Sequence, residues 1–210
     1  MIAGSIVLLG AGGHGRACVD VVEQQGGFTV AGFVGVPAEV GTQVFGYAVL
    51  GTDEEMPALV DRFGQALVTV GQVKTPEPRR SLFDRWVSLG GRTPVIVSPR
   101  AYVSRHATVG AGTIVMHGAV VNAGAVIGRN CIINSQALVE HDTIIADHCH
   151  VATAAAINSG VTIGVGTFIG SQASVRQGLT IGEACVIGMG QRVLADCENG
   201  TRLPSVRRSS

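Results

Sequence analysis

The sequence predicts a small α/β domain followed by a parallel β-helix, and two observations support this prediction. The first is a six-residue period, because every sixth residue from Val97 to Val193 is Val or Ile. The second is a buried apolar run, a glycine-rich loop and a helical segment that follow one another near the N-terminus. A hexapeptide period fits neither an amphipathic helix nor an alternating strand. It is typical of a solenoid whose coils bury their apolar sides against one another.

The other phases of the repeat describe the coil. The residue four places after each Val or Ile is mostly Ala, Thr or Cys, and within a short strand both phases point inward. The residue directly after each Val or Ile is Gly in six repeats and Asn in three. These residues accept positive φ readily, so we expect the tight corners there. Three sides of six residues predict triangular coils without a large insertion.

The N-terminal region reads as alternating strands and helices. A buried strand at 5–9 leads into the loop Gly10–Gly15 and a helix at 16–25. The remaining expected elements are a second strand at 28–34, helices at 53–62 and 77–89, and strands at 66–70 and 95–97. We therefore predict an α/β domain of Rossmann-like type over residues 1–94, a β-helix over 95–198 and a C-terminal tail over 199–210.

The glycine loop predicts a phosphate site. A loop at the carboxyl end of a strand, followed by a helix N-terminus, offers backbone N–H groups to an anion. The motif G-x-G-x-x-G alone is weak. A dinucleotide fold also requires an acidic residue after the second strand, and Gly35 and Val36 stand there instead. We favour another phosphate-bearing ligand over NAD(P), and a purely structural turn remains a third interpretation.

Composition excludes several classes of function. The formal net charge is zero, which gives no support to a nucleic-acid-binding patch. Of the five cysteines, four occupy the small inward phase and Cys18 falls in an expected helix, so we expect buried thiols without a metal role. The N-terminus has no basic segment before an apolar one, and no apolar stretch is long enough to span a membrane. We expect a cytoplasmic protein without membrane insertion.

At this point the chain resembles a known family. The loop Gly10–Gly15, the stretch Asn134–Asp142 and His150, placed before a hexapeptide solenoid, are similar to nucleotide-sugar acetyltransferases related to bacterial sialic acid O-acetyltransferase. Within that family the resemblance favours the N-acetyltransferases that act on GDP-perosamine, enzymes of O-antigen and lipopolysaccharide precursor biosynthesis. The resemblance implies a left-handed β-helix, a homotrimer, acetyl-CoA in the groove between two solenoids and a nucleotide-linked amino sugar on the small domain.

The resemblance also implies roles for particular residues. His141 is expected to be the general base and Asp142 its carboxylate partner, with Glu140 as the alternative partner. An amine that attacks a thioester must lose a proton, and histidine titrates near neutral pH. The other residues carried over are His150, Ser171 and Met189 for acetyl-CoA, and Gly12, Gly13, His14 and Asn134 for the nucleotide sugar. His106, His117 and His148 have no assigned role and are expected at the surface.

Other functions remain open from the residues alone. The transferase could instead O-acetylate sialic acid or N-acetylate a UDP- or dTDP-linked sugar. A γ-type carbonic anhydrase shares the solenoid and holds zinc with three histidines across a trimer interface, for which His117, His141, His148 and His150 are candidates. A non-catalytic nucleotide-sugar or NAD-binding module is a further alternative. The absence of an acid at Gly35–Val36 departs from the family pattern and leaves the base and the sugar open. The tail 199–210 follows the family pattern only loosely, which leaves its role open.

Overall fold

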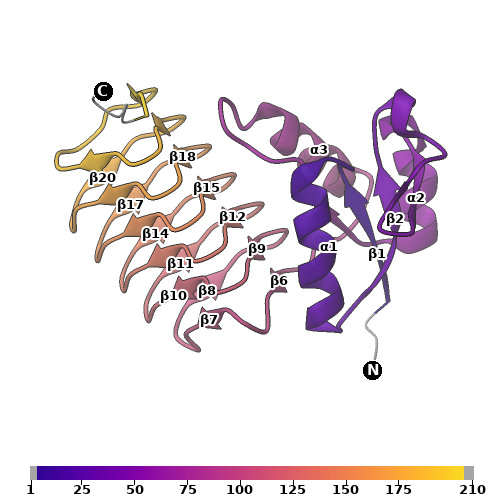
Figure 1. Cartoon of the computed structure of the whole chain (residues 1–210), viewed down its shortest axis with the longest axis horizontal. Coiled ribbons are helices and arrows are strands. Elements are labelled where there is room, and N and C mark those ends of the chain that lie inside the picture. Colours follow the sequence, from indigo (N-terminus) through magenta and orange to yellow (C-terminus); the bar gives the residue numbers. More distant parts are fainter. Residues whose placement is uncertain (1–3, 206–210) are drawn as a thin grey trace. The chain divides into compact units, whose positions relative to one another are not determined.

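The computed structural model describes residues 4–205, which form two compact units. The first unit comprises the chain up to Gly71 together with Glu77–Ser98. The second comprises the chain from Pro99 onward together with the short segment Gln72–Pro76. The division is visible in Figure 1, where the indigo and magenta elements form an α/β unit and the pink to yellow strands form a solenoid.

The first unit is a five-stranded sheet in the order β3-β4-β2-β1-β5 with helices around it. All neighbouring strands are parallel except β3 and β4, which form an antiparallel hairpin. The strands are β1 (Ser5–Leu9), β2 (Thr29–Val34), β3 (Gln43–Val44), β4 (Tyr47–Gly51) and β5 (Ala66–Val68). The helices are α1 (Gly13–Gln25), α2 (Met56–Phe63) and α3 (Glu77–Ser88), with short 3-10 turns η1 (Pro37–Glu39) and η2 (Asp53–Glu55).

Burial explains why this sheet forms. The central strand β1 is an apolar run whose residues 6–9 are fully buried, as expected for a parallel strand covered on both faces. Its side chains Val7 and Leu9 pack in one cluster with Trp86 of α3 and Met56 of α2. The expected strand at 5–9 is confirmed, whereas α1 begins at Gly13, three residues before the expected start.

The hairpin of β3 and β4 was not predicted from the sequence. Its turn consists of Phe45 and Gly46, which both have positive φ, at 50° and 83°. Two consecutive residues with positive φ are typical of a type I′ turn, and Asn-Gly or Asp-Gly is its usual sequence signal. Phenylalanine rarely adopts this conformation, so the turn carried no recognisable signal.

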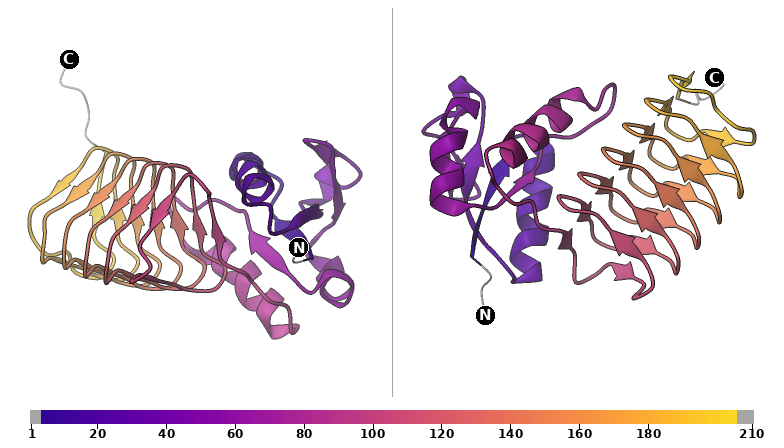
Figure 2. Two further views of the ribbon diagram at one scale, coloured as in Figure 1. Left: turned by 90° about the horizontal axis from the view of Figure 1, so that it is seen from below. Right: turned by 180° about the vertical axis from the view of Figure 1, so that it is seen from behind.

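The second unit is a parallel β-helix that consists of three sheets of two-residue strands (Figure 2). The predicted solenoid is therefore confirmed. One sheet contains β7 (Tyr102–Val103), β10 (Val120–Val121), β13 (Leu138–Val139), β16 (Ala156–Ile157), β19 (Ser174–Val175) and β22 (Arg192–Val193). A second contains β8 (Thr108–Val109), β11 (Val126–Ile127), β14 (Ile144–Ile145), β17 (Thr162–Ile163) and β20 (Thr180–Ile181). The third contains β9 (Ile114–Val115), β12 (Ile132–Ile133), β15 (His150–Val151), β18 (Phe168–Ile169), β21 (Val186–Ile187) and β23 (Arg202–Leu203), and β6 (Ile96–Val97) precedes the first coil.

The strand register confirms a coil of eighteen residues. Val120 pairs with Leu138, and Leu138 pairs in turn with Ala156. The periodic Val and Ile side chains point into the coil, and from Val115 to Val193 each is at most 3% exposed. Because every coil buries the same two phases, the period is a direct result of stacking one coil on the next.

The corners differ from the prediction. From Val109 to Ile187, positive φ occurs three residues after each periodic Val or Ile, at Asn130, Gln136 and Asp142 among others, and not directly after it. The expectation based on glycine and asparagine was therefore wrong. The glycines directly after the Val or Ile serve close approach instead. A Cβ atom on Gly110 or Gly128 would lie 2.6 Å or 2.5 Å from atoms of the next coil, which leaves no room for a side chain.

Candidate functional site

The corner between β13 and β14 presents a histidine and an aspartate to solvent. The Nδ1 atom of His141 lies 2.8 Å from the Oδ2 atom of Asp142. Their side chains are 57% and 73% exposed, and an exposed ion pair of this kind adds little to stability. The pair therefore has no evident role in holding the coil together. If Nδ1 carries the proton that it donates to the carboxylate, Nε2 remains an acceptor that faces outward.

The backbone of the corner explains why an aspartate stands there. Asp142 has a φ of 58°, in the left-handed region that aspartate tolerates better than most residues. The equivalent residue of the preceding coil is Gly124, and a Cβ atom there would lie 2.4 Å from the Oδ1 atom of Asp142. Gly124 thus clears the space that the carboxylate occupies beside His141.

Glu140 is engaged elsewhere in this structure. Its Oε2 atom accepts a hydrogen bond of 2.8 Å from the Nδ2 atom of Asn122 in the preceding coil. Of the two acidic residues that were considered as partners of the imidazole, the structure pairs Asp142 with His141.

A second pair of polar side chains consists of Asn134, at the corner after β12, and His150, on β15 of the third sheet. The Nδ2 atom of Asn134 is 3.2 Å from Nε2 of His150, and its Oδ1 atom accepts the Ser135 N–H at 2.8 Å. His150 is 7% exposed, because its Nδ1 atom lies 2.6 Å from the carbonyl oxygen of Gln72. Its ring also packs edge-on against Phe168, with the ring centroids 5.2 Å apart. The sequence did not predict that a segment containing Gln72 covers His150.

Two residues expected to meet acetyl-CoA through their main chains lie at the same end of the third sheet. Ser171 follows β18, and its carbonyl oxygen accepts the Gly190 N–H at 3.0 Å. Met189 follows β21 and is 54% exposed, with its N–H donated to the hydroxyl of Ser205 at 3.2 Å. These positions are accessible, and their roles stay predictions.

The α/β unit contains a pocket of about 410 Å³ beside the glycine loop. The loop lies between β1 and α1, and Gly12 caps the helix N-terminus without a side-chain hydrogen bond. A helix N-terminus with free N–H groups attracts phosphate. The pocket is lined by Gly10, Ala11, Gly12, Val34, Gly35, Val36, Glu39, Asp53, Val70, Pro78, Ser81 and Leu82.

The four glycines of the loop have two different roles. A Cβ atom on Gly15 would lie 2.4 Å from the carbonyl oxygen of Gly10, and one on Gly10 would lie 2.7 Å from Val70. Packing therefore requires both. At Gly12 and Gly13 a Cβ atom would meet no heavy atom within 4 Å. Packing does not explain these two glycines, and the close approach of a ligand to their backbone stays a prediction.

His14 is held by its own helix. Its Nε2 atom lies 3.5 Å from the Sγ atom of Cys18, one turn further on. Burial raises the pKa of the Cys18 thiol to about 12, so the sulfur keeps its proton at neutral pH and can donate it to the ring. His14 is not among the residues that line the pocket.

Two carboxylates that line the pocket were not predicted from the sequence. Glu39 comes five residues after β2 ends, and its Oε2 atom turns back to accept the Val36 N–H at 3.0 Å. Asp53 belongs to η2, after β4. Both line the pocket next to Gly35, where the sequence offered no acid. The sequence signal for Glu39 was the turn at Pro37, which brings the chain back toward the end of the strand.

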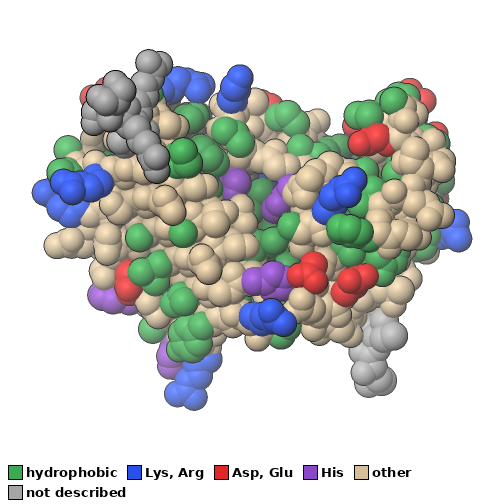
Figure 3. All heavy atoms as spheres, in the orientation of Figure 1, with side chains coloured by type: hydrophobic (Ala, Val, Ile, Leu, Met, Phe, Trp, Pro, Cys, Tyr) green, Lys and Arg blue, Asp and Glu red, His purple; other side chains and the backbone are tan. Residues whose placement is uncertain are grey.

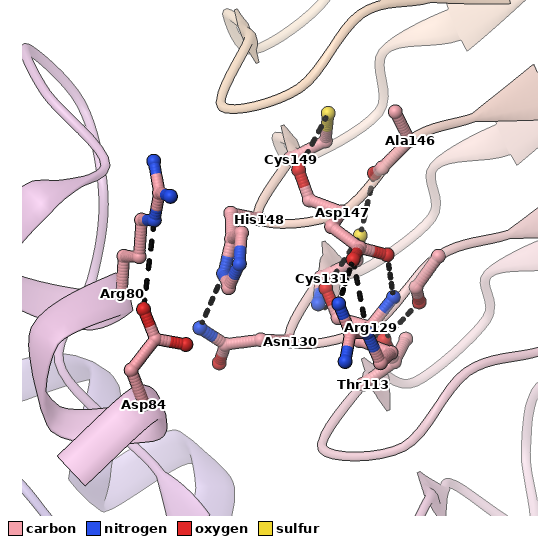
Figure 4. Close-up of polar contacts among 11 residues, drawn as sticks. Arg80, Asp84, Thr113, Arg129, Asn130, Cys131, Ala146, Asp147, His148 and Cys149 are labelled. Carbon is pink, nitrogen blue, oxygen red and sulfur yellow. Dashed lines mark hydrogen bonds and ion pairs between the residues drawn. The ribbon is translucent and has the colours of Figure 1, made fainter.

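His148 is buried, which corrects the expectation that it lies at the surface. Its Nδ1 atom lies 3.0 Å from the Nδ2 atom of Asn130 in the preceding coil (Figure 4). Beside it, the Arg129 guanidinium binds Asp147 through two hydrogen bonds of 2.9 Å and 2.7 Å. Partial burial opposes ionisation of Asp147, but the Arg129 N–H and guanidinium outweigh it and lower the pKa of the carboxyl. These contacts link neighbouring coils of the solenoid.

The cysteines are core residues, as expected, with one exception. Cys131, Cys149 and Cys185 are buried, whereas Cys197 is partly exposed, and all are free thiols. The Cys149 and Cys131 thiols donate to main-chain carbonyls, and burial raises the pKa of the Cys149 thiol. Among residues 4–205, no three His, Cys, Asp or Glu side chains are placed to hold a metal ion.

On the face shown in Figure 3 the Lys and Arg side chains are scattered over separate places and form no single basic patch. Within the described part of the chain, none of the helices has the length and apolar character needed to cross a bilayer.

Comparisons with known proteins match both units. The model of the PglD N-terminal domain matches residues 5–85, and the model of the bacterial transferase hexapeptide, six repeats, matches residues 106–141. A sequence comparison with curated proteins found no match.

Solved structures match over nearly the whole chain. The acetyltransferase domain of PglB from Neisseria gonorrhoeae, in complex with acetyl coenzyme A, is 29% identical, with a TM-score of 0.86 and 94% of each chain covered. PerB from Caulobacter crescentus, in complex with CoA and GDP-perosamine, is 31% identical, with a TM-score of 0.89 over 95% of this chain and 93% of that chain. A variant of perosamine N-acetyltransferase from the same organism, with asparagine in place of a histidine and the same two ligands, is also 31% identical over 95% and 92%, with a TM-score of 0.89.

Proposed function

The chain belongs to the hexapeptide-repeat family of nucleotide-sugar acetyltransferases, and we propose that it transfers an acetyl group from acetyl-CoA to the amino group of a nucleotide-linked amino sugar. GDP-perosamine is the substrate we favour, because the Caulobacter relatives at 31% identity hold GDP-perosamine together with CoA. The observation that supports the chemistry best is the exposed His141–Asp142 pair, which has the composition of a general base and lies outside the core.

The proposed reaction is a direct transfer. The sugar amine enters in its neutral form, and its nitrogen attacks the carbonyl carbon of the thioester. Nε2 of His141 takes the proton that the nitrogen loses, while the Asp142 carboxylate holds Nδ1–H and stabilises the imidazolium. The carbon–sulfur bond then breaks, and the thiolate of CoA takes the proton from His141. The histidine returns to its neutral form, and no covalent bond to the protein forms.

The other predicted residues are assigned around this step. Asn134 is proposed to contact the sugar and His150 the thioester region. Ser171 and Met189 would meet acetyl-CoA through their main chains. The pocket of the α/β unit would hold the nucleotide, with the pyrophosphate at the backbone of Gly12 and Gly13 and His14 close to it. Its acidic lining by Glu39 and Asp53 suits hydroxyl and amino donors.

Assembly into a homotrimer is part of the proposal. The outward side chains Ala156, Phe168 and Val186 are half-buried in the single chain and are available to a neighbour. Ile114 of β9 is already fully buried in the single chain and is not available to a neighbour. Light scattering at micromolar concentration should give three times the mass of one chain, and a monomer would remove the groove between solenoids.

The test is a thiol-release assay with acetyl-CoA and a panel of GDP-, UDP-, dTDP- and CMP-linked amino sugars. We expect release with at least one amino sugar, fastest with GDP-perosamine, and no release with the matching sugar that carries a hydroxyl in place of the amine. Release with hydroxyl substrates or sialic acid alone would replace N-acetylation by O-acetylation. No release with any acceptor would contradict the proposal. We place the product in glycan precursor synthesis in the cytoplasm, for O-antigen or a related polymer.

A further inference from the structure

The segment Gln72–Pro76, here called the strap, is anchored on the solenoid. Its neighbours Gly71 and Val73 are exposed, yet Gln72 is only 2% exposed. The Nε2 atom of Gln72 donates to the carbonyl oxygen of Gly166 at 3.1 Å. Gly166 also lies against Pro76, because a Cβ atom at Gly166 would be 2.9 Å from the Cγ atom of the proline. Two contacts at Gly166 therefore fix the strap at both of its ends.

The strap determines which nitrogen of His150 carries a proton. The Gln72 carbonyl oxygen is 2.6 Å from Nδ1 and can only accept, so Nδ1 must be the donor. Nε2 of the same ring faces the Asn134 amide at 3.2 Å. The amide has one orientation, because Oδ1 is the acceptor of the Ser135 N–H, and Nδ2 is therefore the donor to Nε2. These bonds are complete only with a neutral imidazole protonated at Nδ1.

We propose that the strap is the positioning element of the acetyl-transfer site. The Gln72 carbonyl orients His150, and His150 orients the Asn134 amide, which keeps a second N–H for the substrate. This inference rests on the proposed function for the roles of His150 and Asn134 in the reaction. A side chain whose proton and ring orientation are fixed by a neighbour needs no reorganisation when the substrate binds.

The first measurement needs no substrate. Histidine labelled with ¹⁵N gives separate nitrogen signals for the two neutral tautomers, and the signals of His150 are identified by their loss in His150→Gln. We expect the Nδ1–H form in the wild-type protein, the reverse of the form that predominates in free neutral histidine. An Nε2–H form in the wild type would overturn the proposal, whether or not the enzyme is active.

The second measurement displaces the strap. Gly166→Ala places a methyl group against Pro76, at a position where φ is +71°. The matched control is Gly178→Ala, where φ is +70° and a Cβ atom meets no heavy atom within 4 Å. Both variants carry the same backbone strain, but only the first disturbs the strap. Should Gly166→Ala not fold, Gln72→Leu removes the donor to Gly166 at similar volume.

We expect Gly166→Ala to lose the Nδ1–H signal of His150 and to lower kcat/KM on the order of tenfold, as misplacement of a positioned group does. Gly178→Ala should keep both the signal and the rate. Equal effects of the two variants on the signal would show that the strap does not set the tautomer. If the Nδ1–H signal were lost but the rate unchanged, the orientation of His150 would not affect catalysis through Asn134, which would contradict the proposal. If the wild type had the Nδ1–H form but showed no activity, the proposed function would be contradicted. The strap would then still be the contact that orients His150.

Discussion

The glycine loop of the α/β unit and the Glu140–Asp142 corner of the solenoid prepare for a substrate in different ways. In the loop the backbone carries the binding groups, and the unexplained residues are Gly12 and Gly13, which have no side chains to pack. In the corner the side chains of His141 and Asp142 are proposed to carry the chemistry, and the positive φ of Asp142 shapes the turn on which they lie.

This difference implies a division of kinetic effects. Contacts that hold a substrate equally in the ground state and the transition state change KM, whereas groups that act only in the transition state change kcat. Substitutions in the loop should therefore raise KM for the sugar nucleotide, and substitutions in the corner should lower kcat.

Replacement of the base is the largest effect. His141→Asn should fold and assemble normally, because 57% of the His141 side chain is exposed. Loss of a general base costs roughly 10²–10⁴ in rate. Steady-state turnover at neutral pH, with circular dichroism as the control for folding, checks this. Turnover close to that of the wild type would remove His141 from the mechanism.

A bulky residue in the loop should act on binding. Gly13→Leu places a side chain where the structure is open and the phosphates are proposed to approach. Loss of hydrogen bonds to a charged group costs about 1.5–3 kcal/mol, or roughly 10–100-fold in KM for the sugar nucleotide. KM for acetyl-CoA should stay nearly the same.

Gly15→Ala is the contrasting variant for Gly13→Leu. Its methyl group would collide with the Gly10 carbonyl, so it should lower the midpoint of thermal unfolding instead of raising KM selectively. If Gly13→Leu raised both KM values equally, the loop would not be the nucleotide site.

The partner of the base should matter less than the base. Asp142→Asn keeps an oxygen that can hold the imidazole but removes the charge that strengthens this hydrogen bond. A loss of about 1–1.5 kcal/mol corresponds to roughly tenfold in kcat. Binding of acetyl-CoA, measured by calorimetry, should not change.

Glu140→Gln is the control for Asp142→Asn, since Glu140 binds Asn122 and not the imidazole. Its kcat should stay within about twofold of the wild-type value, as for a charge away from the reacting atoms. A silent Asp142→Asn together with a damaging Glu140→Gln would reverse the assignment of the partner.

The smallest effect should come from Gly124. In Gly124→Ala the added methyl group would meet the Asp142 carboxylate, which must move away from its position beside His141. We expect a decrease in kcat of a few-fold, on the order of a lost neutral hydrogen bond. Gly160→Ala, two coils after Gly124 at a similar positive φ and with open space around it, should leave kcat unchanged. Equal values for the two variants would show that the carboxylate position does not limit the rate.

The solenoid could be predicted from the sequence because its physical cause is repetitive. Each coil buries Val or Ile in one phase and a small residue in another, so stacking of the coils requires a six-residue period in the sequence. The corners could not be predicted equally well. The positions with positive φ hold residues as different as Gln136, His148 and Ala154. The glycines directly after the periodic Val or Ile are needed because neighbouring coils approach closely there.

The candidate site could be predicted from the sequence only where it consists of side chains and not of main-chain groups. His141 and Asp142 stand together in the sequence and in the structure. The partner of His150 is the main-chain carbonyl of Gln72, 78 residues away, and a carbonyl leaves no residue-type signal. Glu39 was missed for a related reason. It reaches the end of β2 only because the turn at Pro37 folds its carboxylate back onto the Val36 N–H.

We propose that the acetyl group passes to an amine of a nucleotide-linked sugar. This transfer can be observed by incubating the wild-type protein with [¹³C]acetyl-CoA and GDP-perosamine and recording the NMR spectrum of the sugar nucleotide. We expect a ¹³C carbonyl bonded to the sugar nitrogen as an amide, formed by the wild type and nearly absent with His141→Asn. Label that appears only as an ester on a sugar hydroxyl, or only as free acetate, would contradict it.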